Sequence, residues 1–340
     1  MSVQIYISKE EIIMKKTLAL ILALVLALSL LTVATAEEPK ALKTGLSIVA
    51  TMSGSKDAEK AAFDATLVAV LVDENGVIYD CVIDSVGPAV KFDATGAITS
   101  DVAAEVLTKN EQGDAYNMVT YGGAVAEWYA QADALAQFAV GKTVEEFKTG
   151  AVTETGYALE GTDLAAGCTI YIGGYVSAVE AAVNNAKDLG AKEGDELVLA
   201  SATDLTGSKA AAAEAAGLAQ MYTQAIALTK NEGVITSAYI DAVQAKVNFD
   251  ATGAITTDLS APVATKNELG EAYGMKAWGG AIAEWDTQAA SFCNYITGKT
   301  ADEVAGIAVN EKTVPTDADL LASVTIKIGE FLTLVEKAMK

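Results

Sequence analysis

The strongest constraint on the fold of this chain is an internal repeat. Residues 91–111 align without gaps with residues 248–268, and 15 of the 21 positions are identical. The same offset of 157 residues relates shorter matches on the C-terminal side: Gly122-Gly123 with Gly279-Gly280, Glu127-Trp128 with Glu284-Trp285, and Gly141-Lys142-Thr143 with Gly298-Lys299-Thr300. A constant offset over this length indicates a duplication. We therefore expect two tandem copies of one small domain, at residues 44–187 and 196–340, joined by a charged, glycine-containing linker.

Antiparallel hairpins are expected at the start of each copy. Residues 65–86 contain two apolar, β-branched runs on either side of an Asn-Gly turn signal at Asn75-Gly76. Residues 90–99 repeat the pattern around Asp93-Ala94-Thr95-Gly96, where short polar side chains and a glycine tolerate positive φ. Both stretches predict strands that return on themselves.

Helical patterns follow the hairpins. Apolar residues recur at helical spacing before Gly141, a predicted C-terminal cap: Trp128, Ala132, Leu135 and Ala139. Each copy then ends with a short alternating run, residues 168–172 or 324–328, which predicts a strand, and with a further helix that has an apolar face. Antiparallel hairpins packed against helices in mixed order predict an α+β fold.

The first 36 residues have the pattern of an N-terminal extension and a secretory signal peptide. Met14-Lys15-Lys16 supplies a positive segment, residues 17–33 an apolar stretch, and Ala34-Thr35-Ala36 a small-residue cleavage site. An uncleaved anchor is the alternative, although the apolar stretch is near the lower length limit for a membrane span. We expect cleavage near Ala36 and a secreted or extracytoplasmic protein without a membrane span in the mature chain.

Composition excludes several classes of function. The 45 acidic and 23 basic residues give a formal net charge of −22, which repels phosphate backbones, so nucleic acid is not an expected partner. The chain has no histidine, which removes imidazole-based catalytic triads and the usual zinc sites. Cys81, Cys168 and Cys293 are too far apart for a local metal motif. These absences favour an electron carrier or a binding protein over an enzyme with its own turnover.

The last unit of each copy resembles the signature of the FMN-binding domain family. The segments are TDLAAGCTIYIGGYVSAVEAAVNNA and DADLLASVTIKIGEFLTLVEKAM. In that family an Asp is followed by two variable residues, a Ser or Thr, a Gly, an Ala and a Thr that carries flavin. Asp163, Gly167 and Thr169 match the Asp, Gly and Thr places in the first copy, and Asp319 and Thr325 match the Asp and Thr places in the second. The departures are Ala166 and Ala322 for the hydroxyl residue, Cys168 and Val324 for Ala, and Ser323 for Gly.

The resemblance implies FMN as a covalent cofactor. In the family an exported transferase esterifies the phosphate of FMN onto the threonine, and the domains carry electrons outside the cell membrane. A flavin transferase and a membrane redox partner are therefore the implied partners. A threonine at a junction of strand and helix would place the linked phosphate near helix N-terminal amides, where the dipole favours negative charge. A glycine there would allow close backbone approach.

Other residues allow both a flavin-related and a structural interpretation. The repeated block also contains Asp, two residues, Thr, Gly and Ala, but Ile98 and Ile255 stand where the acceptor threonine is required, so a hairpin turn explains it better. Cys168 fits a small hydrophobe better than a redox group. Several aromatic and Met residues fit core packing or stacking on a flavin ring: Tyr116, Met118, Trp128, Tyr273, Met275, Trp285 and Trp278.

Two functions remain open from the sequence. The first is an extracytoplasmic electron carrier with flavin on Thr169 and Thr325, in which the cofactor supplies the chemistry. The second is a secreted, non-catalytic binding or surface-interaction protein that keeps the fold without flavin. The oligomeric state stays open.

Overall fold

The computed structural model describes residues 39–340, of which residues 40–340 form one compact unit. Helices and antiparallel sheets are both present, so the expected α+β class is confirmed. The expected extension and signal peptide lie outside the described residues. Within residues 39–340, no helix is both long and apolar enough to cross a membrane.

The first sheet has the order β1-β3-β4 and is antiparallel. Its strands are β1 (Lys43–Thr51), β3 (Asp64–Val72) and β4 (Ile78–Val86). The predicted turn joins β3 to β4: an Asp73 carboxylate oxygen accepts hydrogen bonds from the amides of Asn75 at 2.8 Å and Val77 at 2.9 Å, and Gly76 has a φ of 78°. The turn signal is therefore confirmed, since glycine adopts this positive φ without strain.

The second sheet has the order β6-β7-β8 and is also antiparallel. Its strands are β6 (Glu196–Asp204), β7 (Gly217–Asn231) and β8 (Val234–Phe249). The hairpin of β7 and β8 is longer than that of β3 and β4. In the first copy the two strands of the hairpin are interrupted at Phe63 and at Gly87-Pro88. The residues beyond these breaks form a separate pair, β2 (Lys60–Ala62) and β5 (Ala89–Lys91). A proline has no amide hydrogen to donate to the ladder.

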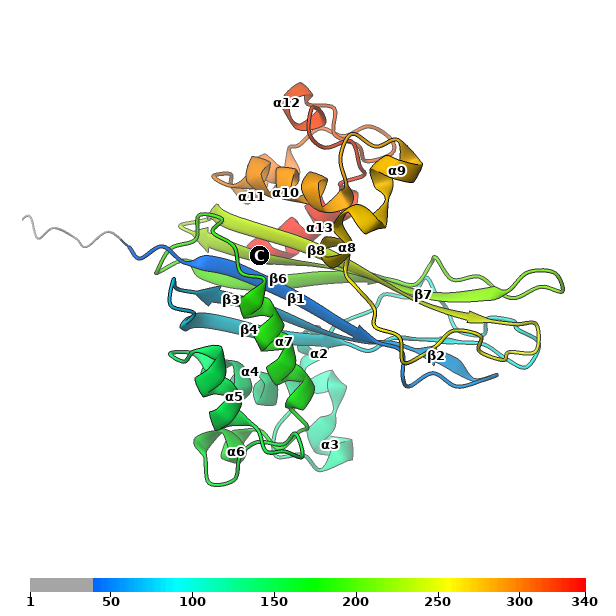
Figure 1. Ribbon diagram of the computed structural model, residues 1–340, viewed down its shortest axis with the longest axis horizontal. Helices are drawn as coiled ribbons and strands as arrows, with labels where there is room; N and C mark the ends of the chain where they lie inside the picture. The colour runs from blue at the N-terminus through cyan, green and yellow to red at the C-terminus, as the bar shows by residue number, and fades with distance from the viewer. Residues whose placement is uncertain (1–38) are drawn as a thin grey trace, which may run out of the picture. The chain divides into compact units, whose positions relative to one another are not determined.

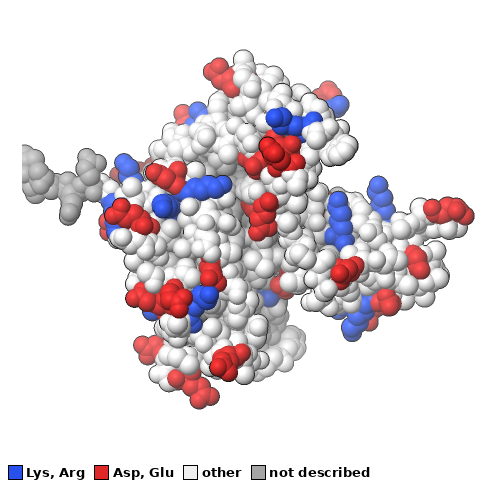
Figure 2. Space-filling model, in the orientation of Figure 1, with Lys and Arg blue, Asp and Glu red and all other residues white. Residues whose placement is uncertain are grey.

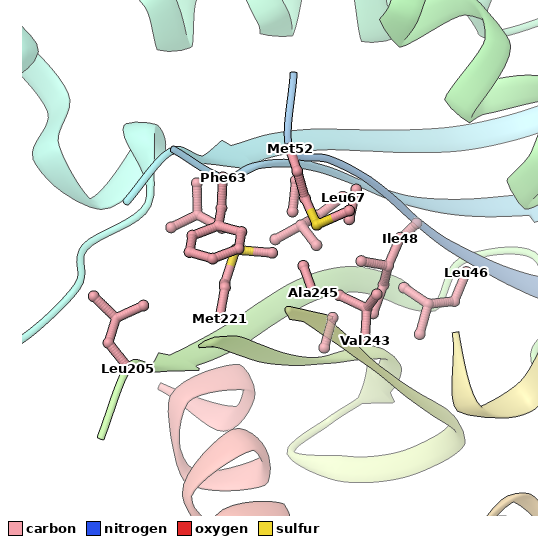
Figure 3. Close-up of a cluster of buried hydrophobic side chains, with 14 of the residues drawn as sticks. Leu46, Ile48, Met52, Phe63, Leu67, Leu205, Met221, Val243 and Ala245 are labelled. Atoms are coloured by element: carbon pink, nitrogen blue, oxygen red, sulfur yellow. The ribbon is translucent and has the colours of Figure 1, made fainter. Parts of the chain in front are cut away.

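The two sheets pack face to face and share a central core. β1 lies against β8, and β3 and β4 lie against β6. Figure 3 shows apolar side chains of the first sheet, among them Ile48 and Leu67, pointing towards Met221 and Val243 of the second. Val68 and Val70 of β3 point the other way, into the core under the helices, as the two-residue period of a strand requires.

Helices cover the outer face of each sheet, so the order of layers is helices, sheet, sheet, helices (Figure 1). The helices on the first sheet are α4 (Trp128–Ala139), α5 (Val144–Ala151) and α7 (Gly173–Asn184). Those on the second sheet are α10 (Trp285–Ile296), α11 (Ala301–Ala305) and α13 (Gly329–Met339). The helix predicted before Gly141 is α4, and that glycine follows its end with a φ of 79°.

Short elements complete each copy in the same sequence. The first copy has α2 (Lys109–Gln112), the 3-10 turn η1 (Gly113–Tyr116), α3 (Met118–Gly122) and α6 (Asp163–Gly167). The second copy has α8 (Lys266–Leu269), η2 (Gly270–Tyr273), α9 (Met275–Gly279) and α12 (Ala318–Leu321).

The near-identical block of the two copies forms a turn in which each copy meets the other. The Asp93 carboxylate accepts from the amides of Thr95 and Ala97, which confirms the predicted turn. The rings of Phe92 and Phe249, which are equivalent residues, stack with centroids 4.0 Å apart and planes 1° apart. Contacts between equivalent residues are the mark of an isologous interface, here within one chain.

The strand expected at 168–172 is absent, and this prediction was wrong. The amide of Cys168 donates to the Leu164 carbonyl, that of Thr169 to Gln131, and that of Ile172 to the Gly156 carbonyl. No neighbouring strand accepts these bonds, so the segment is a loop between α6 and α7. The run 324–328 is likewise a loop, between α12 and α13.

Candidate functional site

The residues of the first copy that match the flavin signature lie in α6 and in the loop that follows it. Asp163 is in the first turn of α6, Gly167 is its last residue, and Thr169 comes two residues later. Asp163 and Thr169 are exposed, whereas Gly167 is half-buried. A Cβ atom placed on Gly167 would lie 3.5 Å from the Cβ of Ala134, which is ordinary contact. The packing of the protein alone therefore does not require a glycine at this position.

A buried glutamine holds Thr169 in place. Gln131 of α4 is fully buried, and its Oε1 accepts from the Thr169 amide at 2.8 Å and from the Thr169 hydroxyl at 3.3 Å. Its Nε2 donates to the carbonyl of Ala126 at 2.7 Å. One side chain thus connects the threonine loop to the loop before α4, with its buried polar atoms paired as burial requires.

The second copy repeats this arrangement. Gln288 of α10 is fully buried and accepts from the amide and hydroxyl of Thr325 at 2.8 and 3.2 Å, and it donates to the Ala283 carbonyl at 2.8 Å. Asp319 is exposed in α12, and Thr325 is half-buried. The two candidate acceptors therefore differ in the room that surrounds them, although their hydrogen bonds are the same.

The sequence interpretation missed the role of these glutamines. Gln131 stands three residues after Trp128, on the apolar face of the same helix, and Gln288 stands at the equivalent place. A polar residue on the buried stripe of a helix in both copies is the signal that identifies them, because a buried amide needs partners.

Two exposed tyrosines lie beside the threonine loop of the first copy. Tyr157 and Tyr171 pack edge to face with ring centroids 5.8 Å apart, and both are at least half exposed. The counterpart of Tyr171 in the second copy is Lys327. Exposed aromatic rings next to a candidate acceptor thus occur in the first copy only.

The aromatic residues considered for flavin stacking divide between core and surface. Trp128 and Trp285 are buried; Trp128 packs edge to face on Tyr175 with centroids 5.8 Å apart and donates to its hydroxyl at 3.2 Å. These rings fill the helix cores. Trp278 is 90% exposed, and its equivalent in the first copy, Tyr121, is 86% exposed.

Tyr121 and Trp278 lie in the short helices α3 and α9, whose first amides are capped by a carboxylate. Glu127 accepts from the amides of Met118 at 2.7 Å and Val119 at 3.1 Å, and Glu284 accepts from the equivalent amides at the same distances. A carboxylate on the first amides of a short helix satisfies donors that have no partner within the helix. Each copy therefore presents an exposed aromatic ring on a capped short helix. The match of Glu127-Trp128 with Glu284-Trp285 in the sequence shows that the glutamate is kept, but it does not show which amides the glutamate binds.

A buried lysine distinguishes the second copy. The Lys266 ammonium donates to the Tyr222 hydroxyl at 2.8 Å and lies over the rings of Tyr222, Tyr273 and Trp285 at 4.5 to 5.0 Å. Burial lowers the pKa of Lys266 to about 8, although the charges of Glu330 and Asp241 oppose this. Ala65 replaces Tyr222 in the first copy, where the equivalent Lys109 contacts two rings only.

The cysteines are buried in the helix cores. Cys168 belongs to the core between the first sheet and its helices, and burial raises the pKa of its thiol. Burial likewise raises the pKa of Cys293 to about 12. Across residues 39–340, no group of three or more acidic or cysteine side chains is placed to hold a metal ion.

Charge is spread rather than concentrated. Figure 2 shows acidic side chains in several separate groups on the visible face, with lysines between them. Five cavities of about 360 to 460 Å³ are lined by residues other than the candidate acceptors Thr169 and Thr325.

Comparison of the chain with protein-family models, with characterised proteins and with solved structures gives no match. The function therefore has to be inferred from the geometry of the residues themselves.

Proposed function

We propose that the chain is an exported electron carrier that holds FMN as a phosphoester on Thr169. The observation that carries the proposal is the exposed residue Thr169, held by a fully buried glutamine at the position where the signature has its acceptor. An exposed threonine gives access both to the transferase and to the bulky product. The isoalloxazine ring would supply the redox chemistry, and the protein would supply its position.

The residues around Thr169 fit a surface-bound flavin. Gln131 fixes the backbone and the side chain of the threonine, and the exposed rings of Tyr157 and Tyr171 provide apolar surface for stacking. Thr325 has the same glutamine contact but is half-buried, and its loop has Lys327 in place of Tyr171. We therefore expect one flavin per chain, on Thr169.

The test is intact mass and visible absorption after co-expression with an exported flavin transferase. A yellow protein heavier by one FMN, with the increment lost in Thr169→Ala and kept in Thr325→Ala, supports the proposal. Thr149→Ala, at a surface threonine of α5, is the matched control and keeps the increment. A colourless protein of unmodified mass refutes it.

A second candidate function rests on a different observation. Each copy exposes an aromatic side chain on a short helix and an aliphatic side chain just after it: Tyr121 with Val125, and Trp278 with Ile282, each more than half exposed. Residues 117–126 contain no charged residue, on a chain whose net charge of −22 repels anionic polymers. We propose an uncharged polysaccharide as the partner in this case, because its apolar ring faces stack on aromatic rings and repeated sites favour a repeating polymer.

Co-sedimentation with insoluble cellulose and chitin tests this candidate. Retention that falls at least tenfold in the double variant Tyr121→Ser/Trp278→Ser, and that persists in Tyr157→Ser, supports it. Absence of retention on both polymers, or retention on phosphatidylcholine vesicles instead, rejects polysaccharide binding and leaves the flavin proposal unaffected.

A further inference from the structure

Three exposed apolar side chains form a patch on the first copy. Tyr157 and Tyr171 are 50% and 57% exposed and pack edge to face with ring centroids 5.8 Å apart, and Leu159 is 38% exposed. Ala158 is buried between Tyr157 and Leu159, as in an extended segment whose alternate side chains point to opposite sides. We call Tyr157, Leu159 and Tyr171 the tyrosine patch.

Backbone hydrogen bonds and close packing hold the tyrosine patch in place. The amide of Thr153 donates to the Tyr157 carbonyl at 2.8 Å, and the amide of Ile172 donates to the Gly156 carbonyl at 2.7 Å. A Cβ atom on Gly156 would overlap the Tyr171 ring, so this ring packs directly on the glycine backbone. A surface that is already ordered loses little conformational entropy when a partner binds to it.

Acidic residues of the same segment accompany the tyrosine patch without basic ones. Glu154, Glu160 and Asp163 are exposed, and among residues 39–340 none of the three is in an ion pair. Residues 149–186 contain no lysine and no arginine. Around α6, Figure 2 shows acidic side chains and no lysine on the visible face. These three carboxylates, the acidic rim, are therefore not neutralised by the segment that carries them.

The second copy keeps the backbone of this region but not the tyrosine patch. The amide of Asn310 donates to the Val314 carbonyl at 2.9 Å and that of Ile328 to the Thr313 carbonyl at 2.9 Å, as in the first copy. The acidic rim is also kept, as Glu311, Asp317 and Asp319. The three patch positions hold no aromatic residue: Val314, Thr316 and Lys327. The exposed rings are therefore a property of the first copy and are not required by the fold.

We propose that the tyrosine patch and its acidic rim dock a redox protein with a basic surface. Lysine and arginine side chains of the partner pair with the rim and lie over the exposed tyrosine faces, which attract cations. The role of this partner rests on the proposed function, because Thr169 precedes Tyr171 by two residues and a flavin there would be the group with which the partner exchanges electrons. Interfaces between redox proteins are small, and attraction between exposed charges is screened by salt, so the complex is weak and salt-sensitive.

Isothermal titration calorimetry of the unmodified chain with cytochrome c, a small haem protein with a basic surface, tests the docking. We expect saturable binding at about 10 mM salt and binding at least about tenfold weaker at about 150 mM, because the screening length falls from about 30 Å to about 8 Å. Glu154→Lys/Glu160→Lys should weaken binding at low salt by about tenfold or more, and Tyr157→Ser/Tyr171→Ser by about threefold or more. Glu271→Lys/Glu311→Lys, at exposed residues of the second copy, is the control with the same change of net charge and should weaken binding by less than about threefold.

Stopped-flow kinetics of the flavin-bearing chain, reduced with dithionite, tests the electron transfer. Two ferric haems each gain one electron, and the reduced FMN is oxidised and releases two protons to solvent. Glu154→Lys/Glu160→Lys should slow this reaction by about tenfold or more and should not slow the reduction of ferricyanide, a small anion that needs no docking surface.

The two experiments separate this inference from the flavin proposal. Absence of saturable binding at low salt, or equal weakening by the rim and control variants, overturns the docking surface whether or not flavin is attached. A chain that carries no flavin but binds cytochrome c through the rim refutes the proposed function and the electron transfer, and leaves a docking surface for a basic protein.

Discussion

Replacing Gln131 by Leu removes the link between the threonine loop and the loop before α4. The carboxamide makes three hydrogen bonds, two accepted from Thr169 and one donated to Ala126, at 2.7 to 3.3 Å. Each bond contributes about 1 kcal/mol net, so the loss of three destabilises the fold by about 3 kcal/mol. Burial of the more apolar Leu side chain stabilises it by about 1 kcal/mol. We therefore expect the free energy of unfolding to fall by about 2 kcal/mol.

The assay is urea denaturation followed by circular dichroism, with thermal unfolding as a second measure. A change of about 2 kcal/mol corresponds to a fall in Tm of about 3 °C for a chain of this size. Gln137→Leu, at an exposed glutamine of the same helix, is the control and should change stability by less than about 0.5 kcal/mol.

Gln288→Leu extends the test to the second copy. Gln131 and Gln288 lie in helices that border separate hydrophobic clusters, so the effects of the two substitutions should add in the double variant. If Gln131→Leu is as stable as the unchanged chain, or if the double variant is strongly non-additive, the glutamines are not the independent anchors that the hydrogen bonds indicate.

Three further predictions concern single positions. Gly253→Ala should lower the free energy of unfolding, measured by urea denaturation, by more than about 3 kcal/mol, because the residue has a φ of 75° and the added Cβ would lie 2.6 Å from the Asp93 carbonyl oxygen. Gly233→Ala is the control: its φ is 80° but the space around it is open, so the substitution should cost only about 1 kcal/mol. Burial lowers the pKa of Lys266 in the folded chain to about 8, from a usual value of 10.5. Between these pH values Lys266 is protonated in the unfolded chain more than in the folded one, so the free energy of unfolding should rise as pH increases from 8 towards 10. Lys266→Met should remove this rise. Burial raises the pKa of Asp241 in the folded chain to about 6, from a usual value of 3.8. The folded chain therefore binds more protons between these values, and the contribution of Asp241 to the free energy of unfolding should fall as pH rises from 4 to 6. In Asp241→Asn the urea midpoint should change less with pH over this range.

Local signals predicted those parts of the fold whose hydrogen bonds are local. The Asn75-Gly76 turn, the turn at Asp93 and helix α4 all follow from residues within a few positions of one another. The run at 168–172 has the alternation of a strand, but a strand needs a partner, and here the amide of Thr169 bonds to Gln131, 38 residues away. Alternation alone does not contain that information.

The pairing of the two sheets could have been inferred from β3. A strand with one solvated face alternates polar and apolar residues, whereas residues 67–72, LVAVLV, are apolar throughout and all buried. Such a run needs a cover on both sides. Helices supply one cover, and the sheet of the second copy supplies the other.

Contact between the copies explains why the block around Phe92 and Phe249 is nearly identical in both. Phe92 stacks on Phe249, and Gly253 lies close to Asp93, so a change in one copy disturbs packing against the other. Positions such as Asp286, which face away from the shared core, have no such restriction and differ between the copies. The same reasoning favours the outer layers, and not the space between the sheets, for new functions such as the one we propose at Thr169 in the first copy.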